Sequence, residues 1–155
     1  MASWGVWTLD WGILDGSIGP RVRLLRNSLA AGSLAVSEPF GLPTGSLTVL
    51  ALIAANPGCA QVQLAARAGI TGPSLVGIVA ELEQRGLLTR QRDSADRRRN
   101  LVVLTAEGQA LMEALFSQVT QIEASVRAAL APDEMVQLTA LLDRAIAALG
   151  ADHAT

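Results

Sequence analysis

The chain has 155 residues, half of them apolar, and a formal net charge of −2. This composition supports a folded core of one domain or two small lobes and excludes a disordered chain. A single cysteine, Cys59, excludes an internal disulfide, and the longest apolar run, 47–55, is too short to span a bilayer, so we expect a soluble cytoplasmic protein.

The first predicted element is a helix near the N-terminus that carries an apolar stripe. This segment lacks the basic start of a signal peptide. The residues of the stripe recur at intervals of three and four, which places them on one helix face. They are Trp4, Trp7, Trp11, Leu14 and Ile18. Gly12 and Gly16 predict a break in this helix. A second helix is expected from Pro20, a favourable first-turn residue, to about Val36.

Three short helices follow a linker rich in proline and glycine, 37–45. The first, 46–56, is apolar on most sides and is expected to be buried. The second ends at Gly69, and the third begins after the capping residue Thr71 and ends at Gly86. Because a small residue and a tight turn separate the last two helices, we interpret them as a helix–turn–helix.

The pattern then changes to two short runs of strand-forming residues, 87–92 and 100–105, around a polar tip. They predict an antiparallel hairpin. Thr105 is expected to cap one long helix that reaches Leu130, and Pro132 to open a last helix. A hairpin directly after a helix–turn–helix is typical of a winged helix, whose second helix enters the major groove of DNA.

The arginines support this interpretation. All twelve basic residues are arginines, and six lie between Arg85 and Arg99, a window that carries +4 on an otherwise acidic chain. Arginine inserted in a narrow minor groove reads DNA shape, and flanking arginines neutralise phosphates. The alternative is a solvated charged turn.

The string "LAARAGITGPSLVGIVAELEQRGLLTRQRDSADRRRNLVVLTAEG" resembles the multiple-antibiotic-resistance regulator (MarR) family of winged-helix transcription factors. "LEQRGLLTR" matches the end of the family's recognition helix and its first wing strand, and "DSADRRRNLVVLTAEG" matches its wing signature. The resemblance implies a mainly α fold with a small β-hairpin wing. It divides the chain into an N-terminal segment with a dimerisation helix (1–43), a winged helix-turn-helix lobe (44–108) and C-terminal dimerisation helices (109–155).

The resemblance further implies a homodimer that binds double-stranded DNA at a pseudo-palindromic operator. Members usually repress genes and often release DNA when a small molecule binds between the dimer helices and the DNA lobe. The expected DNA-binding residues are Thr71, Gly72, Ser74, Gly77, Arg90, Arg92, Asp96, Arg97, Arg98 and Arg99. Of these, Arg98 is our first choice for the minor groove. Asp96 is expected to pair with a neighbouring arginine and hold the tip.

The tryptophan stripe has two interpretations. In one, Trp4, Trp7 and Trp11 pack the N-terminal segment against the dimer helices. In the other, they cover an aromatic effector, and an arginine binds its carboxylate. The candidate arginines are Arg21, Arg23 and Arg26.

Other functions have less support in the sequence. Cys59 lacks the adjacent basic residue of a redox sensor, and His153 is a lone histidine. No cofactor, metal site, membrane partner or enzymatic activity is expected, because no nucleophile–base set, phosphate loop or metal-ligand cluster is present. The alternative function is a winged-helix module that binds a protein in place of DNA.

Overall fold

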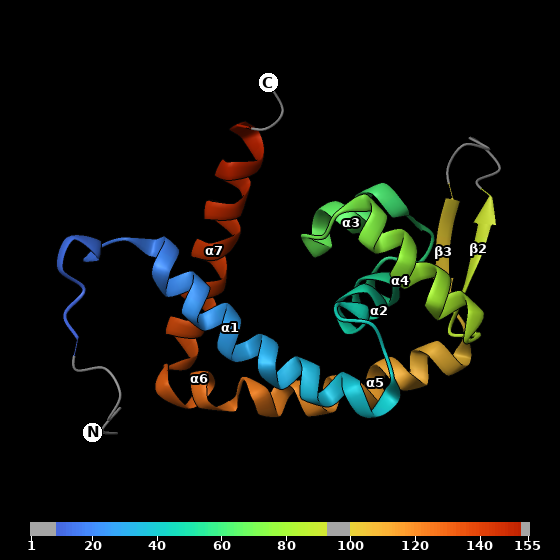
Figure 1. Ribbon diagram of the computed structural model, residues 1–155, viewed down its shortest axis with the longest axis horizontal. Helices are drawn as coiled ribbons and strands as arrows, with labels where there is room; N and C mark the ends of the chain where they lie inside the picture. Colours follow the sequence, from blue (N-terminus) through green and yellow to red (C-terminus); the bar gives the residue numbers. More distant parts are fainter. Residues whose placement is uncertain (1–8, 93–99, 153–155) are drawn as a thin grey trace.

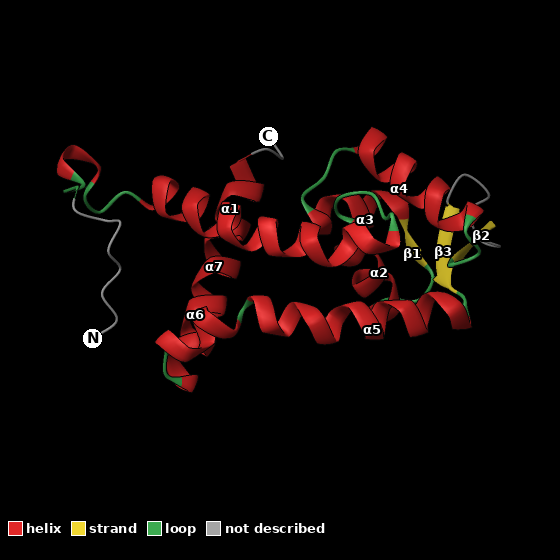
Figure 2. Cartoon of the chain, turned by 60° about the horizontal axis from the view of Figure 1, so that its bottom comes forward, coloured by secondary structure: helices red, strands yellow, loops and turns green. Residues whose placement is uncertain are grey.

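The structure is a computed structural model that describes residues 9–92 and 100–152 (Figure 1). Long helices form an arm along one side, and a lobe of three short helices and a small sheet lies at one end of it (Figures 1 and 2). The helices of the arm are α1 (Ile18–Ser37), α5 (Ala106–Ile122), α6 (Ala124–Ala129) and α7 (Pro132–Asp152). Those of the lobe are α2 (Ser46–Ala55), α3 (Gln61–Ala68) and α4 (Gly72–Gln84), and two short 3-10 helices are η1 (Gly12–Leu14) and η2 (Glu38–Phe40).

The sheet contains the predicted hairpin and one further strand. β2 (Leu88–Arg92) pairs antiparallel with β3 (Asn100–Leu104), in register from Leu88 opposite Leu104 to Arg92 opposite Asn100. β1 (Cys59–Ala60) pairs with the other edge of β3. This strand was not predicted from the sequence. A two-residue strand shows no alternation of its own and depends on its partner strand.

The core lies in the lobe and includes the arm helix α5. The predicted burial of the apolar helix α2 is confirmed, because several of its side chains are fully enclosed. The most deeply buried apolar residues are Val49, Leu50, Ile53, Leu75, Val79, Leu82, Leu88, Val102 and Leu115. Since Leu115 belongs to α5, the core extends from the lobe into the arm.

Two helix predictions differ from the structure. The long helix expected to reach Leu130 ends at Ile122, and α6 begins after Glu123. Ser117 and Thr120 donate their hydroxyls to backbone carbonyls one turn back, and such bonds often bend helices. At the other end, α1 begins at Ile18, before the expected Pro20, whereas the predicted break is present, because the left-handed Gly16 separates η1 from α1.

The arm helices α1 and α5 lie side by side in both views (Figures 1 and 2). They approach closely at Gly32, where a Cβ atom would lie 2.5 Å from Cγ2 of Ile122. The arm leaves many apolar side chains exposed, namely Ile18, Val22, Leu34, Phe116, Val136, Leu141, Ile146 and Leu149. Such an exposed surface marks a site of association. Within the described residues, no single helix has both the length and the hydropathy to cross a membrane.

Candidate nucleic-acid interface

The predicted helix–turn–helix is present in α3 and α4. Their axes meet at 111°, within the range of DNA-binding helix–turn–helix motifs. Gly69 adopts a left-handed φ of 65° in the turn, and its N–H bonds back to the carbonyls of Ala65 and Ala66. Ala60 caps α3 without a side-chain oxygen, and only the reciprocal bond forms, from its N–H to Oε1 of Gln63 at 3.3 Å.

Three of the expected DNA-binding residues, Thr71, Gly72 and Ser74, lie at the start of α4. Thr71 Oγ1 accepts the backbone N–H of Ser74 at 3.3 Å and lies 2.8 Å from the Ser74 hydroxyl. Thr71 therefore caps the helix, as predicted, and both side chains remain exposed. Their hydroxyls stay within reach of a phosphate or base edge placed at this helix end.

Over residues 72–80, the outer face of α4 has small, uncharged side chains. A Cβ atom built on Gly72 or Gly77 would meet nothing within 4 Å, so both glycines face open space. Sequence reasoning missed Val76, which is 51% exposed on the same face. The sequence signal for an exposed position was an apolar residue that lies outside the buried apolar stripe of this helix. An exposed apolar side chain here suits the methyl group of thymine.

Gly77→Ala is expected to stabilise the fold by about 1 kcal/mol, because alanine is favoured over glycine inside a helix and the new methyl meets no neighbour. The same methyl would occupy space against DNA, so operator affinity should fall. Thermal unfolding and operator titration measure the two effects separately. Higher stability with unchanged affinity would remove Gly77 from the interface.

Among the wing arginines, the structure describes the side chain of Arg90, and those of the others lie outside the described residues. Arg90 Nε lies 2.9 Å from Oε2 of Glu83, and its side chain is 29% exposed. Its charge is therefore balanced by α4, which weakens it as a phosphate contact. The side chain of Arg92 and the whole of Asp96, Arg97, Arg98 and Arg99 lie outside the described residues.

Cys59 is half-buried and is the first residue of β1. Burial raises the pKa of its thiol, which lowers its thiolate fraction at neutral pH. A raised pKa disfavours the thiolate that a redox sensor uses. Within the described residues, no group of three or more histidine, cysteine or carboxylate side chains could hold a metal ion, and His153 lies outside them.

Comparison with known proteins identifies this architecture. The sequence model of the MarR family matches residues 40–99. The homoprotocatechuate degradative operon repressor of Escherichia coli is 35% identical over 99 residues, which cover 64% of this chain and 67% of that protein. The chain belongs to the MarR family.

Solved MarR-type structures extend the likeness beyond the lobe. The repressor CouR bound to a 23-mer DNA duplex is 30% identical, with a TM-score of 0.74 over 88% of this chain and 96% of that one. NadR in complex with 4-hydroxyphenylacetate is 29% identical, with a TM-score of 0.77 over 84% of this chain and 92% of that one. The mainly α winged-helix fold expected from the sequence is confirmed.

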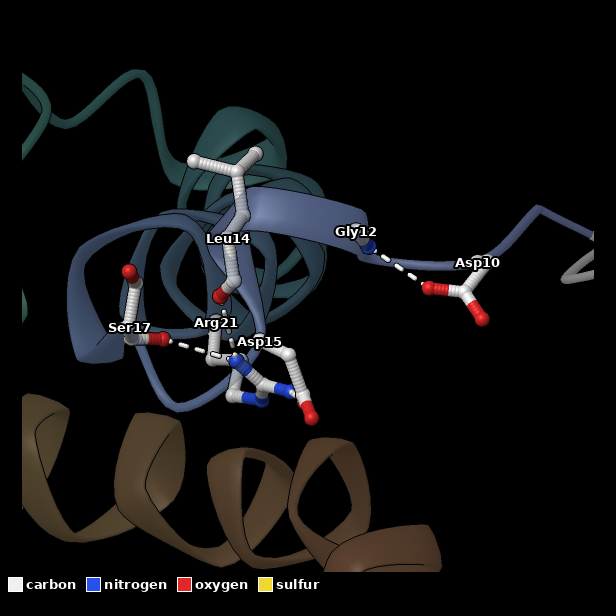
Figure 3. A network of polar contacts seen from close by, with 6 residues as sticks. All are labelled: Asp10, Gly12, Leu14, Asp15, Ser17 and Arg21. Atoms are coloured by element: carbon white, nitrogen blue, oxygen red, sulfur yellow. Dashed lines mark hydrogen bonds and ion pairs between the residues drawn. The ribbon is translucent and has the colours of Figure 1, made fainter.

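The N-terminal segment of this MarR-family chain is folded back by Arg21 (Figure 3). The Arg21 guanidinium lies 4.5 Å from the centroid of the Trp11 ring and 3.2 Å from Oδ1 of Asp15. It also donates to the carbonyls of Ser17 at 2.8 Å and Leu14 at 3.3 Å. Arg21 is thus occupied with holding η1 against α1.

A cavity of about 480 Å³ opens beside this fold-back, within the usual size range of small-molecule sites. It is lined by Leu9, Asp10, Trp11, Leu14, Pro20, Arg23 and Leu24. Of the expected effector residues, the structure brings together Trp11 and Arg23 here. Arg26 is exposed and does not line the cavity, and Trp4 and Trp7 lie outside the described residues.

Proposed function

We propose that the chain is a transcriptional repressor that binds a pseudo-palindromic operator as a homodimer and is released by a small aromatic acid. The observation that carries this proposal is the helix pair at 111° followed directly by an arginine-rich hairpin. The likeness to CouR on its DNA duplex supports DNA over a protein as the partner of the lobe. We place the protein in the cytoplasm, because the operator DNA that it binds is located there.

The homodimer uses the exposed apolar surface of the arm described above. In this arrangement, 1–43 and 109–155 hold the two copies together, and 44–108 binds DNA. Each copy presents one α4, and the two recognition helices enter successive major grooves about 34 Å apart.

Readout is divided between α4 and the wing. Residues 72–80 of α4 contain no charged side chain and no arginine, asparagine or glutamine, the residue types that make the strongest bidentate base contacts. Direct base readout by α4 therefore rests on Thr71, Ser74 and close backbone approach at Gly72 and Gly77. The wing arginines other than Arg90, namely Arg92 and the run 97–99, supply phosphate contacts and the reading of minor-groove shape.

The effector site is the cavity beside η1. Trp11 supplies an aromatic wall and Arg23 a cation, a pair that suits a ring carrying a carboxylate. NadR, a relative of similar fold, was solved with 4-hydroxyphenylacetate, a ligand of this chemistry. The cavity is lined by the first turns of α1. That end of α1 lies away from the lobe (Figure 1). A ligand there acts on DNA through α1 and the dimer, and not by direct contact with the lobe.

Arg23→Ala is expected to raise the effector concentration needed for DNA release by about tenfold or more, the effect of losing one hydrogen bond to a charged group. Operator affinity without effector should not change, because the cavity is remote from α4. Arg26→Ala is the matched control, since Arg26 lies one turn along α1 and does not line the cavity. Equal effects of the two substitutions would contradict the site.

The experiment that tests the proposed function selects bound duplexes from a random pool at low salt. Small aromatic acids and thioesters are then screened for release of the enriched sequence. A palindrome with half-sites one helical turn apart, and affinity that falls steeply with salt, is the expected result. A pool without an enriched site at low salt would refute DNA binding and favour a protein-binding module.

A further inference from the structure

Arg85 follows α4 directly and is held by three close contacts. Its Nε lies 2.7 Å from Oε1 of Glu81, one turn back in the same helix. Nη1 donates to the carbonyl of Phe40 at 2.8 Å, and Nη2 donates to the carbonyl of Gly41 at 2.7 Å. The guanidinium therefore spans two segments that lie more than forty residues apart in the chain.

The two carbonyls belong to the linker that joins the arm to the lobe. α1 ends at Ser37, η2 continues to Phe40, and Gly41 closes the turn with a left-handed φ of 59°. Carbonyls at such a turn carry partial negative charge and accept well from a guanidinium. Arg85 thus connects the end of α4 to the linker that follows α1.

The position of Arg85 separates it from the DNA-reading residues. Thr71 and Ser74 lie in the first turn of α4, whereas Arg85 follows its last residue. Three of its five N–H donors bond to Glu81 and to the linker, so the side chain is occupied by contacts within the protein. The linker is also anchored by Leu42, which is buried in the lobe core. Loss of Arg85 is therefore expected to leave the fold intact.

We propose that Arg85 is a positioning residue that fixes the angle of α4 relative to α1, and thereby the distance between the two recognition helices of the dimer. This inference rests on the proposed function. α1 belongs to the arm that joins the two copies, so rotation of the lobe about the linker changes the spacing of the half-sites that the dimer fits. The planar guanidinium donates to two successive carbonyls and so restrains this rotation. A lysine ammonium in its place acts as a point charge without this fixed geometry.

The test measures affinity for operators whose half-sites are separated by the selected spacing, or by one base pair more or less. Wild-type protein should prefer the selected spacing. Arg85→Ala and Arg85→Lys should both bring the ratio of these affinities toward one. A ratio of affinities is independent of the fraction of folded protein, so a merely structural defect leaves it unchanged.

The salt dependence of binding separates positioning from phosphate contact. A positioning residue leaves the slope of log affinity against log salt unchanged, whereas loss of one phosphate contact reduces it by about 0.9. Arg127→Ala is the matched control. Arg127 makes the same kind of pair with a glutamate one turn back, at 2.7 Å, and no hydrogen bond to another described element. It should retain the wild-type ratio.

The outcomes are distinct. Flattened spacing preference in both Arg85 variants, with an unchanged salt slope, supports the proposal. A reduced slope, or an affinity loss equal at all spacings, overturns it, as does a wild-type ratio in Arg85→Lys. If the wild-type protein binds no duplex, the proposed function itself fails.

Discussion

Gly108→Ala is expected to lower the free energy of unfolding by about 3 kcal/mol or more, at the upper end of the range for overpacked interiors. Gly108 is buried in the first turn of α5. A Cβ atom built there would overlap the carbonyl oxygen of Leu87, a backbone atom that no rotamer change can move. The clash can be relieved only by separating α5 from the start of the wing.

The surrounding hydrogen bonds explain why this separation is costly. Thr105 Oγ1 accepts the Gly108 N–H at 3.1 Å and donates to the carbonyl of Gly86 at 2.7 Å. The backbone N–H of Thr105 donates to the carbonyl of Leu87 at 3.1 Å. These bonds join the end of α4, the start of β2 and the cap of α5. A shift of the backbone at Gly108 breaks several of them together.

Thermal unfolding at matched protein concentration measures the effect. A chain of this size loses about 2–4 °C per kcal/mol, so Gly108→Ala should melt roughly 6–12 °C below the wild type. Gly77→Ala is the control, because its Cβ atom meets nothing within 4 Å and its melting temperature should rise. If the Gly108→Ala protein had the same melting temperature as the wild type, α5 could move away from Leu87 without cost.

The parts of the fold that the sequence predicts well are those with local signals. The cap at Thr71, the left-handed turn at Gly69 and the cap at Thr105 each depend on one residue and its immediate neighbours. The features that were missed have no such signal. β1 exists because β3 offers it an open edge, and the break at Glu123 is not marked by proline or glycine.

The candidate site shows the same division. The sequence locates the helix–turn–helix and the wing, but a count of arginines overstates the charge available to DNA. Glu81 and Glu83 balance Arg85 and Arg90 in the structure. The first pairing could be read from the four-residue spacing of Glu81 and Arg85. The second joins a helix to a strand, and the bonds from Arg85 to the linker cross forty residues, so neither follows from local pattern.

Arg98→Ala is expected to weaken operator binding by about 1–3 kcal/mol, or roughly 5- to 150-fold, if Arg98 makes a base-edge contact in the minor groove. Arg98 lies outside the described residues, and the prediction rests on the wing signature of the sequence. The structure strengthens the reason for it. With Arg85 and Arg90 paired to glutamates, the remaining cations of the window are Arg92 and the run 97–99.

Operator titration at several salt concentrations, with intact and altered flanking sequence, measures the role of Arg98. Reading of the minor groove predicts that Arg98→Ala reduces the preference for the selected flank, since arginine there senses groove width. A pure phosphate contact would lower affinity on all sequences alike and reduce the salt slope by about 0.9. Unchanged affinity in Arg98→Ala would remove Arg98 from the interface and leave base readout to the uncharged face of α4, where Val76, Ser74 and the two glycines would have to supply it.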